Sequence, residues 1–178
     1  GTIATKSFLT SHIVHCVFGL GVTTINPNVF WGVYCVNLES VTIGPHVTSI
    51  TQGFAGSNSK LTDIILDSQN TTFHVDNNIL YKKDGSNNVH TMIQYPLGST
   101  VTYLTVPTDV VIIAEYFAVG ASNLDTLIMP EGLTTIGNYA FYYNSGLTTV
   151  YIPSTVTSIG SAAFTPTSGN QISDPPTT

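Results

Sequence analysis

The chain carries little charge of either sign and contains no arginine. Of its 178 residues, four are lysine, ten are acidic, and only 8% in all are charged, giving a formal net charge of −6. The usual charged share of a globular protein is about a quarter. Because phosphate recognition requires clustered lysine and arginine side chains, this composition argues against nucleic acid as a partner.

Long apolar runs and cysteine are also scarce. No run approaches the roughly 18 residues of a membrane-spanning helix, so we expect no membrane span in this chain. Cys16 falls on an inward strand position and Cys35 on a turn, which does not favour one disulfide between them, and we expect each to be a small buried hydrophobe. The chain begins with Gly1 and shows no charged start followed by an apolar core, which is typical of a fragment whose targeting segments are absent.

The serine, histidine and aspartate residues of the chain match no known catalytic or metal-binding motif. No serine stands in a G-x-S-x-G setting. His12 and His15 have the spacing H-x-x-H, but on a strand their side chains would point to opposite faces, which disfavours a metal site. Asp67, Asp76 and Asp84 are more typical of turns than of a calcium site. We therefore predict no catalytic residue, no metal and no cofactor, and a protein that is not an enzyme.

A repeat of 23 residues organises the chain. Pro107, Pro130 and Pro153 are spaced by this period, and each closes a short apolar run. Residues 124–141 read LDTLIMPEGLTTIGNYAF and residues 147–164 read LTTVYIPSTVTSIGSAAF. Looser copies occupy 101–123, 38–60 and 13–37, and a unit that begins at 61 leaves the register until 101, which makes about six units. A fixed period of this length indicates stacked repeats.

Each unit has the pattern of two short strands. Val150 and Ile152 alternate with Thr149 and Tyr151, the period of two that marks a half-buried strand. The following proline lacks an N–H donor and ends the ladder. A second β-branched stretch and an Ala-Phe step then turn further apolar groups inward. A single unit has nothing to bury them against, so we predict a β-rich solenoid of stacked units with little helix.

These motifs resemble the BspA-type, or treponemal, class of leucine-rich repeat proteins, whose unit reads L-x-x-[IV]-x-[IL]-P-x-x-[VL]-T-x-I-G-x-x-A-F-x-x-C-x-x-L. The steps LTTIG at 133–137 and VTSIG at 156–160 match its most diagnostic part. Cys35 falls on the cysteine position, which Asn58 and Asn144 take in their own units. Residues 54–55 and 117–118 read Phe-Ala in place of Ala-Phe, and we expect this inversion to affect the local turn geometry.

The irregular stretch at about 67–100 resembles an insertion common in this family, N-x-x-F-x-V-x-x-x-x-L-Y-x-K-D…Y-P-x-G. Within it, Asp84 and Gly85 separate two alternating runs and predict a β-hairpin whose connection extends through 86–88. Asn70 begins a formal N-glycosylation sequon. The chain then divides into an N-terminal flank at 1–12, a leucine-rich-repeat solenoid at 13–164, and a Pro/Ser/Thr-rich tail or linker at 165–178, too polar to join a core.

The first strands of the units would present two outward rows of side chains. One row holds His15, Ser40, Asp63, Tyr103, Thr126 and Thr149, and the other holds Val17, Thr42, Ile65, Thr105, Ile128 and Tyr151. Because exposed aromatic groups carry much of the energy of interfaces, we predict a ligand-binding face formed by His15, Tyr103, Thr105, Thr126, Ile128, Thr149 and Tyr151. The other interpretation is ordinary strand-forming residues on a solvated sheet.

The resemblance implies a secreted or cell-surface protein that mediates adhesion to host matrix proteins or to other cells, with proteins or glycans as partners. A second hypothesis is a structural spacer that projects another domain from the cell surface and has no ligand of its own. A third is ice binding through rows of threonine, against which Asp63 and the large rings argue.

Overall fold

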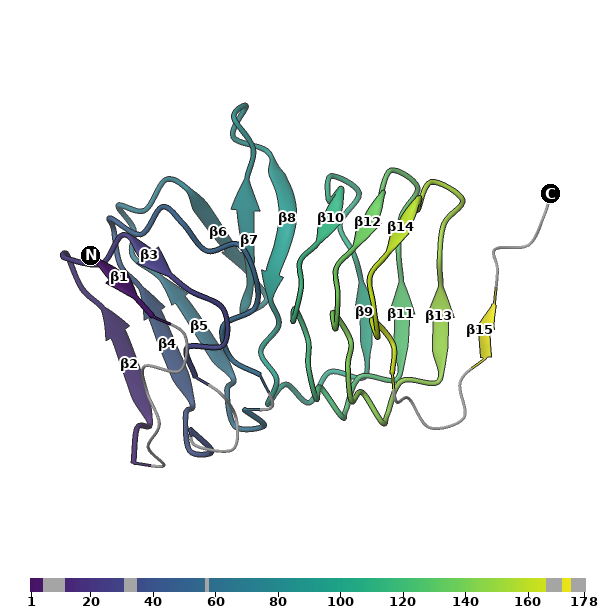
Figure 1. Cartoon of the computed structure of the whole chain (residues 1–178), viewed down its shortest axis with the longest axis horizontal. Helices are drawn as coiled ribbons and strands as arrows, with labels where there is room; N and C mark the ends of the chain where they lie inside the picture. The colour runs from purple at the N-terminus through teal and green to yellow at the C-terminus, as the bar shows by residue number, and fades with distance from the viewer. Residues whose placement is uncertain (5–11, 31–34, 57, 166–170, 174–178) are drawn as a thin grey trace.

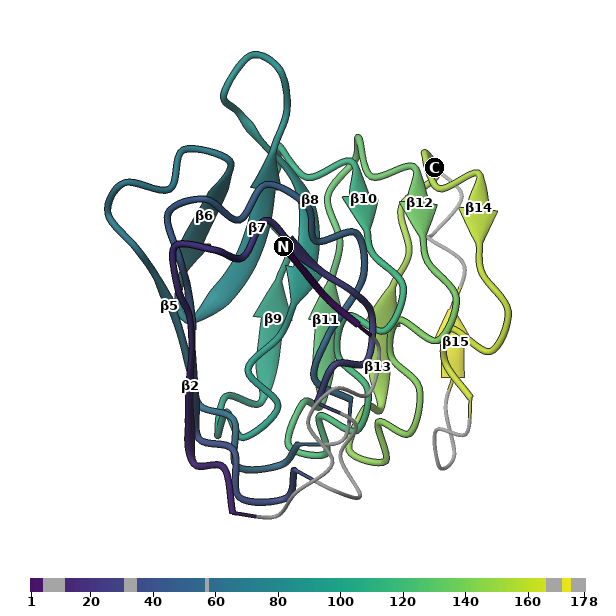
Figure 2. The ribbon, with the colours of Figure 1, turned by 60° about the vertical axis from the view of Figure 1, so that its left-hand side comes forward.

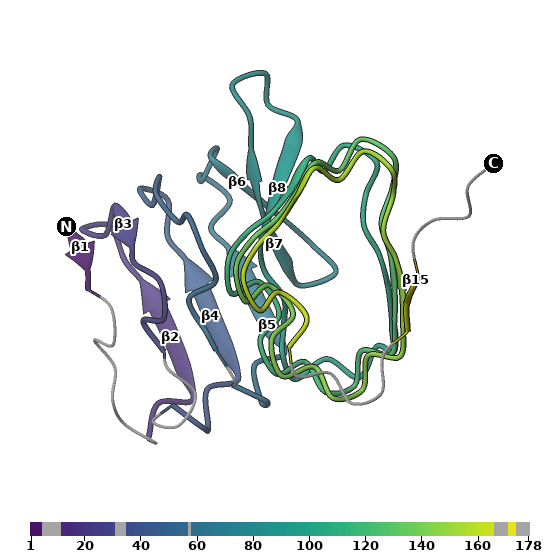
Figure 3. The same cartoon turned by 45° about the vertical axis from the view of Figure 1, so that its right-hand side comes forward.

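The described residues form a β-solenoid in which the units stack one after another along the long axis of the molecule (Figure 1). The structure is a computed structural model that describes residues 1–4, 12–30, 35–56, 58–165 and 171–173. None of these residues lies in a helix. Viewed more nearly along the stack, the traces of the later units fall almost on top of one another (Figure 3). The predicted β-rich leucine-rich-repeat solenoid of about six units is confirmed.

The first strands of the units form two separate parallel sheets. One sheet contains, in order, β2 (His15–Phe18), β4 (Ser40–Ile43) and β5 (Asp63–Leu66). The other contains β9 (Tyr103–Thr105), β11 (Thr126–Ile128), β13 (Thr149–Tyr151) and β15 (Gln171–Ser173). Within each sheet, every second side chain points inward; Leu104, Leu127 and Val150 are buried in successive strands.

The second strands form the opposite side of the solenoid. One sheet runs in the order β14 (Ser158–Ile159), β12 (Thr135–Ile136), β10 (Ile112–Ile113), β8 (Val89–Gln94), β7 (Ile79–Lys83) and β6 (Phe73–Asp76). Further toward the N-terminus, β1 (Thr2–Ile3) pairs in parallel with β3 (Thr24–Ile25). Both β1 and β15 therefore extend the sheets beyond the limits of 13 and 164 that the sequence predicted for the solenoid.

The insertion consists of two hairpins that return the chain to the second side. Asn77 and Asn78 both have positive φ, 49° and 60°, which is the signature of a tight type I′ turn between β6 and β7. Between β7 and β8 the amide of Asp84 donates to the carbonyl of Asn88 at 2.8 Å, so the longer connection expected there is confirmed. This connection projects beyond the stacked units in both Figure 1 and Figure 2. β8 then pairs in parallel with β10.

Aromatic rings stack through the interior. Phe18, Phe30 and Phe54 have centroid separations of 5.9 and 6.5 Å. A second column holds Tyr95, Phe117, Phe141 and Phe164, with centroids 6.0, 5.7 and 5.3 Å apart. Each such contact contributes about 0.5–1.5 kcal/mol beyond the burial of area. The ring contacts thus stabilise the packing of neighbouring units in addition to the hydrogen bonds between their strands.

The Phe-Ala inversion leaves the turn geometry of its unit unchanged. The residue before the two-residue step, Tyr116 in the inverted unit and Tyr139 in the next, has φ of 56° in both. Phe117 and Ala118 are both buried, as are Ala140 and Phe141, so a ring at either position enters the core. The expected effect of the inversion on the turn is therefore wrong for this unit.

The core divides into two clusters at the insertion, and Gln94 links the main chain on both sides of the division. Its side chain is fully buried. Oε1 accepts hydrogen bonds from the amides of Phe54 at 2.8 Å and Ala55 at 3.0 Å. Nε2 donates to the carbonyls of Tyr95 at 2.9 Å and Phe117 at 3.3 Å.

Candidate functional site

The outward rows keep the predicted register within each sheet but are interrupted between the sheets. His15 pairs with Ser40, and Ser40 with Asp63; separately, Tyr103 pairs with Thr126, and Thr126 with Thr149. β5 and β9 come from consecutive units and do not pair. The β6–β7 turn lies at this break, where Asn78 Nδ2 donates to Asp63 Oδ1 at 3.4 Å. The prediction of continuous rows is therefore wrong at this point.

Six of the seven predicted binding residues lie together on β9, β11 and β13, and His15 lies on β2 in the other sheet. There the His15 Nδ1 is 2.8 Å from Ser40 Oγ. The grouped set is Tyr103, Thr105, Thr126, Ile128, Thr149 and Tyr151. Tyr103 is 64% exposed, Ile128 40% and Tyr151 49%, which makes this set an exposed apolar face with threonines between its large side chains. None of the four lysines of the chain belongs to these strands.

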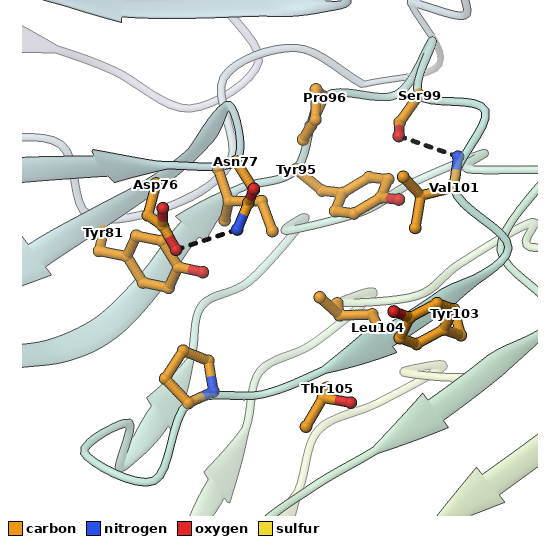
Figure 4. Close-up of a pocket in the computed structure, with 12 residues that line it drawn as sticks. Asp76, Asn77, Tyr81, Tyr95, Pro96, Ser99, Val101, Tyr103, Leu104 and Thr105 are labelled. Atoms are coloured by element: carbon orange, nitrogen blue, oxygen red, sulfur yellow. Dashed lines mark hydrogen bonds between the residues drawn. The ribbon is translucent and has the colours of Figure 1, made fainter.

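A cavity of about 410 Å³ opens beside this face, at the break between the two sheets (Figure 4). One wall is β9 with its flanking residues, and the other is the β6–β7 turn with the start of β7. The lining residues are Asp76, Asn77, Ile79, Tyr81, Tyr95, Pro96, Ser99, Val101, Tyr103, Leu104, Thr105 and Pro107. The lining includes one carboxylate and no basic group. This cavity could not be predicted from the sequence, because its two walls are about 25 residues apart and come together only in the folded chain.

Two buried tyrosines, Tyr81 and Tyr95, line the cavity. Burial, and to a lesser degree the charge of Asp76, raise the pKa of Tyr81 far above its ordinary value. Burial also raises the pKa of Tyr95, and the nearby Ser99 side chain opposes part of this rise. The Tyr95 hydroxyl nevertheless makes no hydrogen bond of normal geometry within the described residues. Both phenols therefore remain protonated at neutral pH and can act as hydrogen-bond donors.

The remaining reactive groups of the described residues include two thiols. Cys16 and Cys35 are not joined in a disulfide. Burial, and to a lesser degree the electrostatic effect of Cys35, raise the pKa of the Cys16 thiol to about 11. This makes the thiol a poor nucleophile. Within the described ranges, no group of three or more His, Cys, Asp or Glu side chains is placed to hold a metal ion. No helix long and apolar enough to cross a membrane occurs there either.

A cluster of tyrosines on the turn side was not anticipated from the sequence. The rings of Tyr116 and Tyr139 stack with centroids 5.3 Å apart and planes only 2° from parallel. Tyr142 packs edge-on against Tyr139 at 5.4 Å and against Tyr143 at 4.2 Å. The spacing of Tyr116 and Tyr139 equals one repeat, and this is the signal that could have revealed the pair.

The family model described as "BspA type Leucine rich repeat region" matches six copies over residues 1–91 and 97–177. This chain belongs to the BspA-type leucine-rich repeat family. The match includes residues on both sides of the insertion, and it reaches into the two terminal segments in which β1 and β15 lie. No curated protein sequence matches this BspA-type chain.

Three solved structures show the same fold. A leucine-rich repeat protein from Eubacterium ventriosum has a TM-score of 0.67 and 29% identity, over 82% of this chain and 38% of its own length. The pneumococcal vaccine antigen PcpA has a TM-score of 0.58 and 20% identity, over 78% and 38%. A leucine rich cell surface protein from Faecalibacterium prausnitzii has a TM-score of 0.50 and 18% identity, over 85% and 57%. The BspA-type chain thus matches less than two thirds of each of these proteins.

Proposed function

We propose that this BspA-type chain is an extracellular or cell-surface binding module that mediates adhesion to host matrix proteins or to other cells. Its binding surface is the exposed face of β9, β11 and β13. The observation that carries the proposal is the grouping of Tyr103, Ile128 and Tyr151 on three adjacent strands, each at least 40% exposed. Large apolar side chains gathered on one exposed surface are characteristic of interaction sites.

The location and the kind of partner are supported by the comparisons. Leucine-rich repeat proteins generally bind other proteins and are typically not enzymes, and this chain belongs to one of their families. One structural relative is described as a cell surface protein and another as a vaccine antigen. The partner is accordingly a protein or glycan of a host or of a neighbouring cell. The low charge of the face favours a partner surface that is itself largely apolar or neutral.

The proposal is tested by placing three carboxylates on the binding face and the same three on the other sheet. The test variant carries Tyr103→Asp, Ile128→Asp and Tyr151→Asp. The control carries Val17→Asp, Thr42→Asp and Ile65→Asp, at outward positions of β2, β4 and β5. Binding of both and of the unmodified chain to immobilised matrix proteins, glycan arrays and whole cells is measured, with thermal unfolding to check the fold.

Saturable binding that the control keeps and the test variant loses is the expected result. A folded, unmodified chain without saturable binding to any of these surfaces contradicts the proposal. Adhesion by the longer parent protein that the test substitutions leave unaffected would support the alternative of a structural spacer.

A further inference from the structure

The cavity beside β9 runs along a strand edge that pairs with no other described strand. Among the residues that the structure describes, β9 is the last strand of its sheet and pairs only with β11. The neighbouring unit's strand, β5, is the last strand of the other sheet, and in Figures 1 and 2 the two strands stand apart. The solenoid therefore has a free strand edge partway along its length. This edge belongs to β9, and the β6–β7 turn lies across from it.

The main chain of β9 presents hydrogen-bonding groups to this edge. The carbonyl of Thr102 accepts from the amide of Thr126 at 3.0 Å, and the amide of Val106 donates to the carbonyl of Ile128 at 2.9 Å. Alternate residues of a parallel strand direct their N–H and C=O groups to opposite sides. The amides and carbonyls of Tyr103 and Thr105 therefore face the cavity, and both residues line it.

The side chains around the edge are arranged as another strand requires. Leu104, which points inward, has Ile79, Tyr81 and Tyr95 near it in the lining, so the cavity has an apolar floor. The Tyr95 side chain is only 3% exposed, and its hydroxyl is left without a normal partner there. Figure 4 shows the carboxylate of Asp76 at the opposite wall, beside the Tyr81 ring. The lining thus combines apolar groups, a buried hydroxyl and a negative charge.

We propose that the cavity binds an extended peptide segment of a protein partner, which adds to the free edge of β9 as a further strand. One apolar side chain of the peptide would lie opposite Leu104 on the floor, and a neighbouring lysine or arginine would pair with Asp76. The inference rests on the proposed binding function and names the chemistry of its partner, because Tyr103 belongs both to the exposed face and to the cavity. A row of main-chain donors and acceptors at strand spacing suits a peptide better than a sugar.

A single substitution can remove an edge donor and keep the existing ladder. Thr105→Pro deletes the N–H that faces the cavity, whereas the bonds to β11 use Thr102, Leu104 and Val106. Thr105→Val keeps the N–H and is the matched control. Asp76→Asn removes the negative charge with little change in shape. Thermal unfolding of each variant shows whether it is folded.

Peptides are selected against the unmodified chain from a phage-displayed library of random twelve-residue sequences. We expect selected peptides to be enriched in lysine or arginine next to an apolar residue. Their Kd should rise about tenfold in Thr105→Pro, the loss expected for one main-chain hydrogen bond, and change less than about twofold in Thr105→Val. Asp76→Asn should weaken the same peptides. If Thr105→Pro does not fold, slowed amide exchange of Tyr103 and Thr105 on peptide binding gives the same answer.

Other outcomes overturn this inference and separate it from the proposed function. Peptides that bind Thr105→Pro as well as the unmodified chain, but not an Ile128→Asp, Tyr151→Asp variant, place binding on the exposed face alone. A glycan that binds the unmodified chain and loses affinity in Asp76→Asn makes the cavity a sugar site. Failure of peptides, matrix proteins, glycans and cells alike removes both the inference and the proposed function.

Discussion

Replacing Gln94 by leucine should weaken the whole solenoid. The Gln94 side chain is 0% exposed and makes four hydrogen bonds to main-chain groups of three segments. Leucine has nearly the same volume but no donor or acceptor. The amides of Phe54 and Ala55 would then stay buried without a partner.

The expected size follows from those two amides. A buried donor left unsatisfied costs about 1–3 kcal/mol, so the pair costs about 2–6 kcal/mol. Leucine recovers about 1–2 kcal/mol because it buries more apolar surface than glutamine. The free energy of unfolding should therefore fall by about 0–5 kcal/mol, with a mid-range loss of about 2–3 kcal/mol. Because Gln94 joins the two core clusters, we also expect the unfolding transition to become broader or to separate into two steps.

Urea unfolding followed by circular dichroism measures both effects. The matched control is Gln69→Leu, which changes an exposed glutamine of the same insertion and should shift the midpoint hardly at all. Gln94→Glu is a useful third variant, because it keeps an acceptor for the two amides but buries a charge and removes the donor to Tyr95 and Phe117. A Gln94→Leu midpoint equal to that of the Gln69→Leu control would refute the reasoning.

Three further predictions concern the turn at Ala162 and the thiol of Cys16. Ala162 has φ of 52°, so Ala162→Gly should raise the free energy of unfolding by about 1 kcal/mol. Ser161→Gly, at the residue before it, should lower the free energy of unfolding. Urea titrations measure both changes, and equal effects of the two substitutions would contradict this prediction. The pKa of Cys16 is raised to about 11, so at pH 8 we expect its alkylation by iodoacetamide, read by peptide mass spectrometry, to be about a hundredfold slower than that of free cysteine. A folded state that holds this proton more tightly than the unfolded chain loses stability as the pH rises from 9 toward 11, and Cys16→Ser should reduce that loss.

The period of the repeat carried most of the information about the fold. The spacing of Pro107, Pro130 and Pro153 is reproduced in the strand register, where Tyr103, Thr126 and Thr149 lie side by side. Such ladders depend on inward apolar residues at fixed intervals, and these are visible in the sequence. The β7–β8 hairpin was also predictable, since an Asp-Gly pair between alternating runs is a local signal.

Features that depend on main-chain contacts between distant segments could not be predicted. β15 contains Gln171 and Ser173, and its polar composition suggested a linker, although pairing with β13 requires only N–H and C=O groups. The irregular stretch at about 67–100 marks where the register is left, but it does not show that β5 and β9 fail to pair, because residues 61–66 have the pattern of an ordinary first strand. Asn77 and Asn78 could have indicated the turn that borders the cavity, but not its position beside β9.

The stacking of the units has a consequence for the reach of any protein built from them. Adjacent strands are about 4.8 Å apart, so 23 residues advance this solenoid by only that distance, whereas the same number in an α-helix would advance about 35 Å. A column 100 Å tall would need about 480 residues. A protein that had only to hold another domain far from a cell would be served poorly by this architecture. Stacking instead enlarges a continuous lateral surface, because each unit adds one row of side chains that a partner can contact.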